Sequence, residues 1–505
     1  MNTLPLLTIL TLVPAVGAVA AFFAGRHARI VALVTAIASL AVAVTIWFLI
    51  PADGSIGLVE IAPWAPALGI EYHLGVDALG ALMLVLSAIV SLMSIDAAHR
   101  VPRQTGLYFG LVLLLESGLF GAFTALNFFH WFLFWELSLI PAFFLIKLWG
   151  GPRRGPAATQ FFVYTMAGSV ALLVSFLAIY LATGTMDFSE LAAMAANGSL
   201  AQMVTAHLGA VMPWLAVGVL AGFAVKVPMA PFHTWLPAAY AEAPTPVTML
   251  LTGAMSKMGV YGLLRIALPI FGHEVAQFRT PLLVLSVVTV VMGAWAAAAQ
   301  KDLKRIFAYS SVNHLGYCLL GIFAVAVPAA GAAVTQSQAA ALNGVILQMF
   351  NHGLTAAALF WFVSMLQHRS GGHRLIEDFG GLRRPAPVFA GLMGIALFSS
   401  LGMPGLNGFV GEFLIFRGVF SLSWVAASVS ILGLLVTAAV ILTVIQKVFT
   451  GPTPEALTKF PDLNGNERLA LAPVIGLMFL VGLLPQLITS AVNPTVQNLL
   501  AHWRF

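Results

Sequence analysis

Apolar residues follow one another along most of the chain in long stretches, and short polar segments separate these stretches. An α-helix needs about 20 apolar residues to cross a bilayer. The pattern predicts fourteen such helices, near residues 4–24, 30–50, 76–97, 106–126, 128–148, 158–182, 210–235, 245–270, 280–299, 304–327, 339–366, 386–420, 424–448 and 469–491. The sequence therefore predicts an all-α protein that crosses the membrane many times. An even number of crossings places both ends of the chain on one side.

Two of the predicted helices are interrupted. Pro228 and Pro231 break the seventh, and Pro404 breaks the twelfth; each break has one ionisable residue beside it, Lys226 or Glu412. Interrupted helices at matching places in two halves are typical of inverted-repeat transporters, although prolines and glycines are also generally commoner in membrane helices. We expect the fourth to eighth spans to be mirrored by the ninth to thirteenth. The chain then divides into residues 1–105, 106–270 (first repeat), 280–448 (second, inverted repeat) and 449–505.

Composition points to the membrane as well. Hydrophobic residues make up 60% of the chain and charged residues only 8%, against about 25% charged in an ordinary soluble domain. The net charge of +5 comes from basic residues in connections between apolar stretches. That distribution orients membrane proteins and indicates no nucleic-acid partner. Most of the basic residues follow odd-numbered spans, and cationic loops stay in the cytoplasm, so both termini are predicted on the periplasmic side.

Three ionisable residues are predicted deep inside the membrane. Lys226 and Lys257 lie in the seventh and eighth spans, and Glu136 lies in the fifth. A charge at the centre of a bilayer costs about 2.5 to 3.5 kcal/mol on insertion scales, so it persists only where it is paired or hydrated. The alternative is that the two lysines reach the headgroups with their long side chains. We favour a pathway for charge, in which Glu136 faces Lys226 and lets both groups stay ionised.

Histidines and a second carboxylate are further candidates. His314 and His352 lie in the tenth and eleventh spans and titrate near neutrality, which suits proton relay, although a membrane histidine is often only a hydrogen-bonded core residue. Glu116, in the fourth span, belongs either to the pathway or to the packing of the core. His233 lies near the end of the broken helix and could cap carbonyls that the break leaves free.

The candidate proton pathway runs across the plane of the membrane and needs no covalent step. In order, it contains Glu136, Lys226, Lys257, His352 or His314, and Glu412. Cys318 is the only cysteine, and the sequence has no glycine-rich phosphate loop and no helical pair of metal ligands. We therefore expect no cofactor and no metal in this chain, so that any redox chemistry belongs to a partner.

Five segments carry a resemblance to a known family. They are FWELSLIPAFFLI around Glu136, KVPMAPFHTWLP around Lys226, SKMGVYGLLR around Lys257, KDLKRIFAYSSVNHLGY up to His314 and PGLNGFVGEFLI around Glu412. With these motifs the chain resembles the antiporter-like membrane subunits of bacterial NADH:quinone oxidoreductase, respiratory complex I. Most members carry a lysine where this chain has Glu412. A glutamate there, like the fourteen predicted spans, is a feature of the chain M branch of that family.

The resemblance implies a function and a set of partners. Such a subunit translocates protons, and quinone reduction elsewhere in the complex drives it. NADH, FMN, iron–sulfur clusters and quinone are then expected in other subunits. The expected partners are the other membrane-arm subunits, including two further antiporter-like chains, and the lipid bilayer of the bacterial inner membrane.

Two departures keep other interpretations open. Many chain M sequences have an Asp-Ala-His run where this chain has Ala238, Ala239 and Tyr240. The following AEAPTPVTML also resembles the D chain of multisubunit, Mrp-type cation/proton antiporters. A sodium/proton antiporter, the membrane arm of an energy-converting hydrogenase, and a structural scaffold with inert buried charges therefore remain alternatives.

Overall fold

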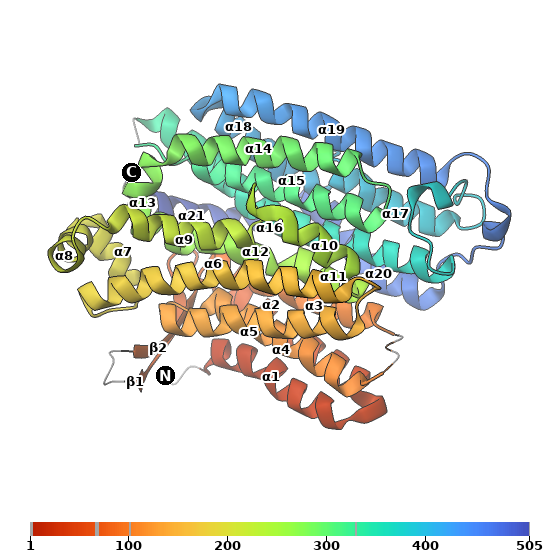
Figure 1. The fold of residues 1–505 in the computed structure, drawn as a ribbon, viewed down its shortest axis with the longest axis horizontal. Coiled ribbons are helices and arrows are strands. Elements are labelled where there is room, and N and C mark those ends of the chain that lie inside the picture. Colours follow the sequence, from red (N-terminus) through yellow and green to blue (C-terminus); the bar gives the residue numbers. More distant parts are fainter. Residues whose placement is uncertain (1–3, 66–69, 100, 102, 329–330, 504) are drawn as a thin grey trace.

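The computed structural model describes residues 4–65, 70–99, 101, 103–328, 331–503 and 505. Most of the long helices run roughly along one direction, and the N and C ends of the chain lie at the same end of this bundle (Figure 1). A two-stranded sheet is also present at that end. The predicted all-α polytopic fold is confirmed in its helical bundle.

Besides two π-helical turns, the first half of the bundle contains fifteen described helices or 3-10 turns up to residue 277. They are α1 (Leu6–Phe23), η1 (Gly25–His27), α2 (Ala28–Leu49), α3 (Ala78–Ala97), α4 (Thr105–Thr124), α5 (Phe128–Trp149), α6 (Arg154–Thr183), α7 (Phe188–Ala196), α8 (Ser199–Leu208), α9 (Met212–Lys226), η3 (Phe232–Thr234), α10 (Trp235–Glu242), α11 (Thr245–Leu250), α12 (Lys257–Gly262) and α13 (Leu268–Gln277). The π-helical turns η4 (Leu251–Met255) and η5 (Leu263–Ala267) join the last three of these into one continuous stretch.

The second half begins with α14 and ends near the C-terminus. Its helices are α14 (Arg279–Ala298), α15 (Leu303–Ala324), α16 (Ala332–Arg369), α17 (Pro387–Ser400), α18 (Asn407–Leu422), α19 (Trp424–Phe449), α20 (Gly465–Leu483) and α21 (Gln486–His502). Two short 3-10 turns, η6 (Ile376–Asp378) and η7 (Glu455–Leu457), lie in its connections.

Twelve of the described helical stretches are long and apolar enough to cross a membrane by themselves. The two other predicted spans, near 210–235 and 386–420, are the two that the sequence predicts to be interrupted. In the structure each is divided: α9 has 15 residues, α17 has 14 and α18 has 16. By length and composition, the described part of the chain thus has twelve candidate spans, or up to thirteen if each bent pair is counted as one span, against the fourteen predicted.

Three connecting segments hold structure that the hydrophobic pattern did not predict. The antiparallel hairpin of β1 (Gly57–Ala65) and β2 (Ile70–Val76) follows α2. The segment before α9 contains two short helices, α7 and α8, and α8 turns away from α9 by 107°. The predicted last span ends early, at Leu483, and the separate helix α21 follows it.

The helices form an enclosed centre and an apolar outer ring. In the α11–α13 stretch, all of the most apolar 18 residues are buried inside the protein. In α15 and in α16, 94% of the corresponding residues are buried, whereas in α2 and α19 only 33% are. Burying polar backbone and side chains among other helices avoids exposing them to lipid. Ionisable residues at membrane depth are therefore expected on the central helices.

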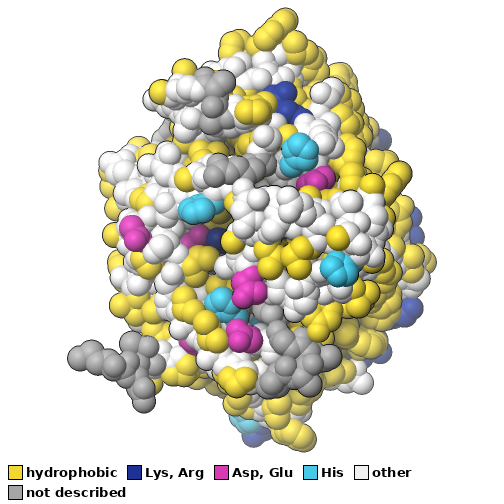
Figure 2. All heavy atoms as spheres, turned by 90° about the vertical axis from the view of Figure 1, so that its left-hand side faces the viewer, with side chains coloured by type: hydrophobic (Ala, Val, Ile, Leu, Met, Phe, Trp, Pro, Cys, Tyr) yellow, Lys and Arg dark blue, Asp and Glu magenta, His cyan; other side chains and the backbone are white. Residues whose placement is uncertain are grey.

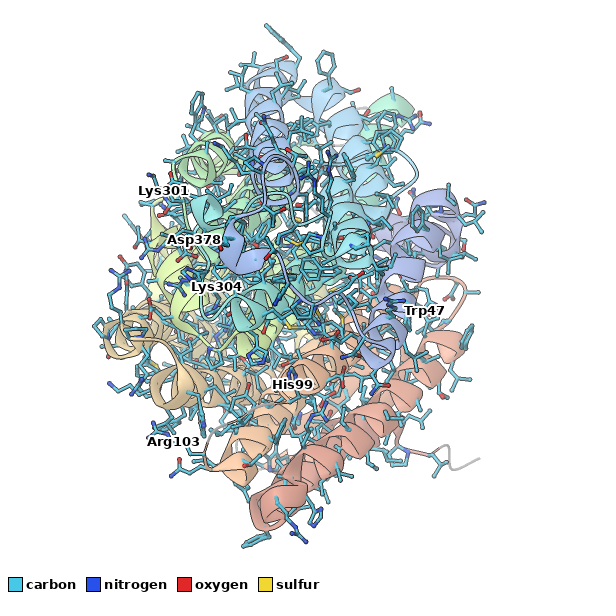
Figure 3. The ribbon with its side chains drawn as sticks, turned by 90° about the vertical axis from the view of Figure 1, so that its right-hand side faces the viewer. Trp47, His99, Arg103, Lys301, Lys304 and Asp378 are labelled. Carbon is cyan, nitrogen blue, oxygen red and sulfur yellow. The ribbon has the colours of Figure 1, made fainter. Side chains whose placement is uncertain are left out.

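The two ends of the bundle differ in charge. Figure 3 looks onto one end, where Lys301 and Lys304 lie near Asp378 and Arg103 lies further away, at the lower left of the view. Figure 2 looks onto the opposite end, where Asp, Glu and His side chains are visible and Lys and Arg are few. The β hairpin and both termini lie at this second end (Figure 1), so the charge asymmetry predicted from the sequence is present in space.

The β hairpin is attached to α7 through His73. Asp187 caps the start of α7 by accepting hydrogen bonds from the amides of Ser189 and Glu190 with one oxygen. Its other oxygen lies 2.5 Å from the His73 Nδ1 atom. The Leu126 amide donates to the His73 carbonyl as well, at 2.9 Å. Strand β2 is therefore held to the start of α7 and to the α4–α5 connection.

This contact predicts a pH dependence for the hairpin. The hydrogen bond to Asp187 raises the pKa of His73 above its ordinary value near 6.5, against the opposing effect of partial burial. A raised pKa means that the stabilisation is complete below about pH 6.5 and is lost as pH rises through the higher folded-state value. We expect the protection of β1 and β2 amides from hydrogen exchange, corrected for intrinsic rates, to fall between pH 6 and pH 9. The expected loss is of the order of 1 kcal/mol.

The matched control is His73→Gln, which keeps a polar side chain but does not titrate. In this variant the β1 and β2 amides should be weakly protected from hydrogen exchange at both pH 6 and pH 9. A wild-type profile that is as flat as the profile of this variant contradicts the interpretation.

Candidate functional site

The break in the first half is built around the end of α9. Helix α9 ends at Lys226, and the chain resumes regular structure at Phe232. Side chains satisfy backbone groups there: the Trp235 indole donates to the Val225 carbonyl at 3.0 Å, and the Ala230 amide donates to the Thr289 hydroxyl at 2.9 Å. An interrupted membrane helix needs such partners because lipid offers none.

Lys226 is buried beside the break, and its side chain is 2% exposed. Its ammonium lies 4.6 Å from the centre of the Trp135 ring, an aromatic contact with a cation. Among the described residues it has no hydrogen-bond partner. Glu136, the next residue on α5, is close enough for its charge to act on Lys226. Neither oxygen of Glu136 accepts a hydrogen bond from a described residue, and Glu136 and Lys226 form no ion pair within 4 Å.

Lys257 lies at the centre of the bundle and is fully enclosed. It follows the π-helical turn η4, a local widening of the helix that often occurs at functional sites. Its ammonium donates to the Thr252 carbonyl of that turn and lies 2.8 Å from His352 Nδ1 on α16. The lysine therefore connects the first half of the chain directly to the second.

From His352 the contacts continue to Glu412. The rings of His352 and His314 have their centres 5.2 Å apart. The Nδ1 atom of His314 lies 3.0 Å from Glu412 Oε1, and the Gln348 amide donates to the same oxygen at 3.2 Å. The sequence left open which histidine faces the pathway. In the structure the two histidines lie one after the other between Lys257 and Glu412.

A narrow internal cavity of about 20 Å³ lies along this row. Its volume is enough for about one water molecule. The polar side chains around it include both histidines and Glu412, and it also touches Ser311, whose hydroxyl lies 3.1 Å from that of Thr252. A water molecule in this cavity would find several hydrogen-bonding partners.

The second break lies beside Glu412. Helix α17 ends at Ser400 and α18 begins at Asn407. Gly402, between them, has a φ of +81°, and a Cβ atom there would lie 2.9 Å from Glu412 Oε2. Both its backbone conformation and the adjacent carboxylate therefore require glycine at this position.

The candidate residues do not form one unbroken row. Lys226 and Lys257 are joined by no described hydrogen bond, although α9 and α12 pack closely: a Cβ at Gly259 would lie 3.1 Å from the Lys226 Cβ. His233 lies in η3, half-buried, apart from the row. Glu116 is fully buried on α4. The site thus consists of a Glu136–Lys226 pair and a Lys257–His352–His314–Glu412 row.

Two buried cations were not among the sequence candidates. Lys304 is 2% exposed and donates to the Ala243 carbonyl at 2.6 Å, in the connection between α10 and α11. Arg265 forms an ion pair with Asp77 at the start of α3. Lys304 stands at the start of a helix and so looked like a loop cation. Both residues fix the ends of helices near the row and do not extend it.

Fold and site together define a polytopic membrane protein of the antiporter-like class. The family model for NADH:quinone oxidoreductase/Mrp antiporter membrane subunits matches residues 125–441. NADH-quinone oxidoreductase subunit M of Rickettsia typhi is 35% identical over 477 residues, which cover 93% of this chain and 92% of the relative. The chain therefore belongs to the NADH-quinone oxidoreductase subunit M family.

Solved structures agree with this assignment. A chain of respiratory complex I from Thermus thermophilus superposes with a TM-score of 0.85 at 27% identity, covering 99% of this chain and 100% of that one. A chain of the Mrp complex from Dietzia sp. DQ12-45-1b gives 0.82 at 23% identity, covering 99% and 98%. The second likeness shows a shared fold.

The packing at the second break predicts the effect of Gly402→Ala. A Cβ in this left-handed conformation costs about 1 to 2 kcal/mol, and it would also displace the Glu412 carboxylate. We expect lower thermal stability of the purified protein, and a distance between His314 and Glu412 longer than 3.0 Å in a structure of the variant. Gly394→Ala is the control, because a Cβ there meets no atom within 4 Å. Equal stability of the two variants would contradict this account.

Proposed function

We propose that this chain is a proton-translocating membrane subunit of an NADH:quinone oxidoreductase, driven by quinone reduction in other subunits. Protons would pass through Glu136, Lys226, Lys257, His352, His314 and Glu412. The observation that carries the proposal is the unbroken run of contacts from Lys257 to Glu412, placed on enclosed helices at the centre of the bundle. Every group in that run is a side chain that can carry a proton, and each lies within reach of the next.

The first pair would act as the gate of this pathway. A lysine beside an ionised carboxylate keeps its proton, and a buried lysine without that partner loses it readily. Lys226 has an aromatic ring and a nearby Glu136, but no hydrogen bond in the described structure. Bringing Glu136 closer would hold the proton on Lys226. Moving it away would release the proton towards Lys257.

Glu412 would be the residue that releases protons to the periplasm. It ends the row beside the break between α17 and α18, where non-helical backbone can be hydrated inside the protein. The end of the bundle that holds Arg103 and Lys301 would face the cytoplasm because cationic loops are retained there. Both termini would then be periplasmic, in a bacterial inner membrane.

The remaining assignments follow from the same proposal. Residues 106–270 and 280–448 would be inverted repeats, each with one broken helix. The redox groups, which are NADH, FMN, iron–sulfur clusters and quinone, would be in partner subunits; the described residues hold no group of three or more potential metal ligands. The partners would be the other membrane-arm subunits, among them two further antiporter-like chains.

The proposal predicts that Glu136→Gln disables pumping in the assembled complex. The amide keeps the shape of the side chain but cannot bind or release a proton, and loss of such a group typically reduces a rate by about 100-fold or more. The measurement is NADH-driven acidification of inverted membrane vesicles, with coupled NADH oxidation recorded alongside. Glu455→Gln, on an exposed turn, is the control. Normal pumping by Glu136→Gln would rule out this pathway.

A sodium/proton antiporter is the second candidate function, because the matching family model covers both classes. The Glu412 carboxylate of the row could bind a cation, but the lysine and the histidines of the row favour protons. We expect the pumping rate in vesicles to be the same in sodium-free and sodium-containing buffer. Dependence on sodium, together with restored salt tolerance in an antiporter-deficient host, would favour the second candidate.

A further inference from the structure

A second polar feature lies outside the row, at the end of the bundle that carries His99 and Arg103 (Figure 3). It is a pocket of about 220 Å³ among the ends of α3, α4, α5, α11 and α16. His99 and His368 both line it, with their ring centres 6.0 Å apart. Arg369 also lines the pocket, but two contacts of 2.5 Å pair it with Glu467. An imidazole has one nitrogen that donates and one that accepts, so these two side chains can hand a proton on.

Serine hydroxyls continue inward from this pocket along α3. Ser94 is buried and donates to the carbonyl of Pro246, a residue that lines the pocket, at 2.7 Å. Ser91 lies one turn further along the same face of the helix, and it is fully enclosed, with a hydroxyl that has no hydrogen-bond partner among the described residues. A hydroxyl both donates and accepts, so two of them one turn apart can pass a proton with a water molecule between them.

Glu116 lies beside Ser91 and is 0% exposed. Neither of its carboxylate oxygens accepts a hydrogen bond of normal geometry within the described part of the chain. A buried carboxylate with no partner is too costly to keep ionised and without use. If Glu116 only filled space, a leucine would do so at a lower cost in free energy.

Along the axis of the bundle, Glu116 lies between the pocket and Lys257. The Tyr261 hydroxyl on α12 donates to the Phe123 carbonyl on α4 at 3.0 Å. Both helices run inward from the pocket end. Glu116 lies seven residues before Phe123, and Lys257 lies four before Tyr261. At 1.5 Å per residue, Glu116 is then about 4 to 5 Å nearer to the pocket than Lys257.

We propose that Glu116 is a proton-loading residue, supplied from the His99–His368 pocket through Ser94 and Ser91, that delivers protons towards Lys257. The pocket would be the place where this chain takes up protons from the cytoplasm. One carboxylate oxygen of Glu116 accepts the proton from the Ser91 hydroxyl or a bridging water molecule, whose O–H bond breaks as the new O–H bond forms, and that donor regains a proton from the side of Ser94 and the pocket. The inference rests on the proposed proton-translocating function, since it names the loading side of the same pathway.

The test uses the whole complex in inverted vesicles, which present the cytoplasmic face to the medium. Glu116→Gln is expected to lower the rate of NADH-driven proton uptake by at least about tenfold, and Glu116→Asp should recover part of it. The double variant His99→Phe with His368→Phe should lower the rate by a smaller factor, and added imidazole should partly restore it. Ser117→Ala is the control on α4, because the Ser117 hydroxyl donates to the Thr11 carbonyl at 2.8 Å.

A labelling experiment separates proton loading from simple packing. A hydrophobic carbodiimide reacts with protonated carboxyl groups, so mass spectrometry should find Glu116 labelled in the wild type. Labelling should fall in the double histidine variant if the pocket supplies the proton. Normal uptake by an assembled Glu116→Gln complex, while Glu136→Gln is inactive, would overturn this inference and leave the proposed function intact. Normal uptake by both variants would overturn both.

Discussion

The free-energy cost of an isolated charge in a membrane is the constraint on which this structure depends. Because that cost is several kcal/mol, the ionisable groups lie on helices that other helices surround. Lys257, Arg265 and Lys304 each donate to a carbonyl or a carboxylate. The outer helices can then be almost wholly apolar. Lys226 is the exception, since its ammonium has an aromatic face and a nearby carboxylate, but no hydrogen bond within the described structure.

The two halves of the candidate site therefore differ in how firmly their ionisable side chains are held. A cation over an aromatic ring is stabilised by about 2 kcal/mol when it is desolvated, less than a well-made buried ion pair. Small movements of Glu136 relative to Lys226 would consequently change where the proton resides. In the other half, direct contacts join Lys257, His352, His314 and Glu412, so a proton that arrives there can be passed on. An asymmetric arrangement of this kind favours control at the first pair.

Much of this was predictable from the sequence, and the limits have physical reasons. Apolar length fixes which segments can cross a membrane, so most of the long helices followed from the pattern alone, and the predicted Lys226, Lys257 and Glu412 are buried inside the protein. Contacts between side chains depend on how helices are rotated about their axes relative to one another. The sequence therefore could not predict that His352 and His314 lie one after the other, or that no hydrogen bond joins Lys226 to Lys257. The β hairpin and α21 were missed because neither is a long apolar stretch, so apolar length carries no information about them.

The two broken helices explain why such a site needs interruptions. A continuous helix uses all its backbone groups internally, so it offers a proton only side chains. At the first break, Trp235 and Thr289 occupy some of the freed groups, and the end of α9 places its partial negative charge beside Lys226. At the second break, the absence of a side chain at Gly402 leaves space for the Glu412 carboxylate. Each break therefore places one ionisable group next to backbone that can change its hydration, which an intact helix could not do.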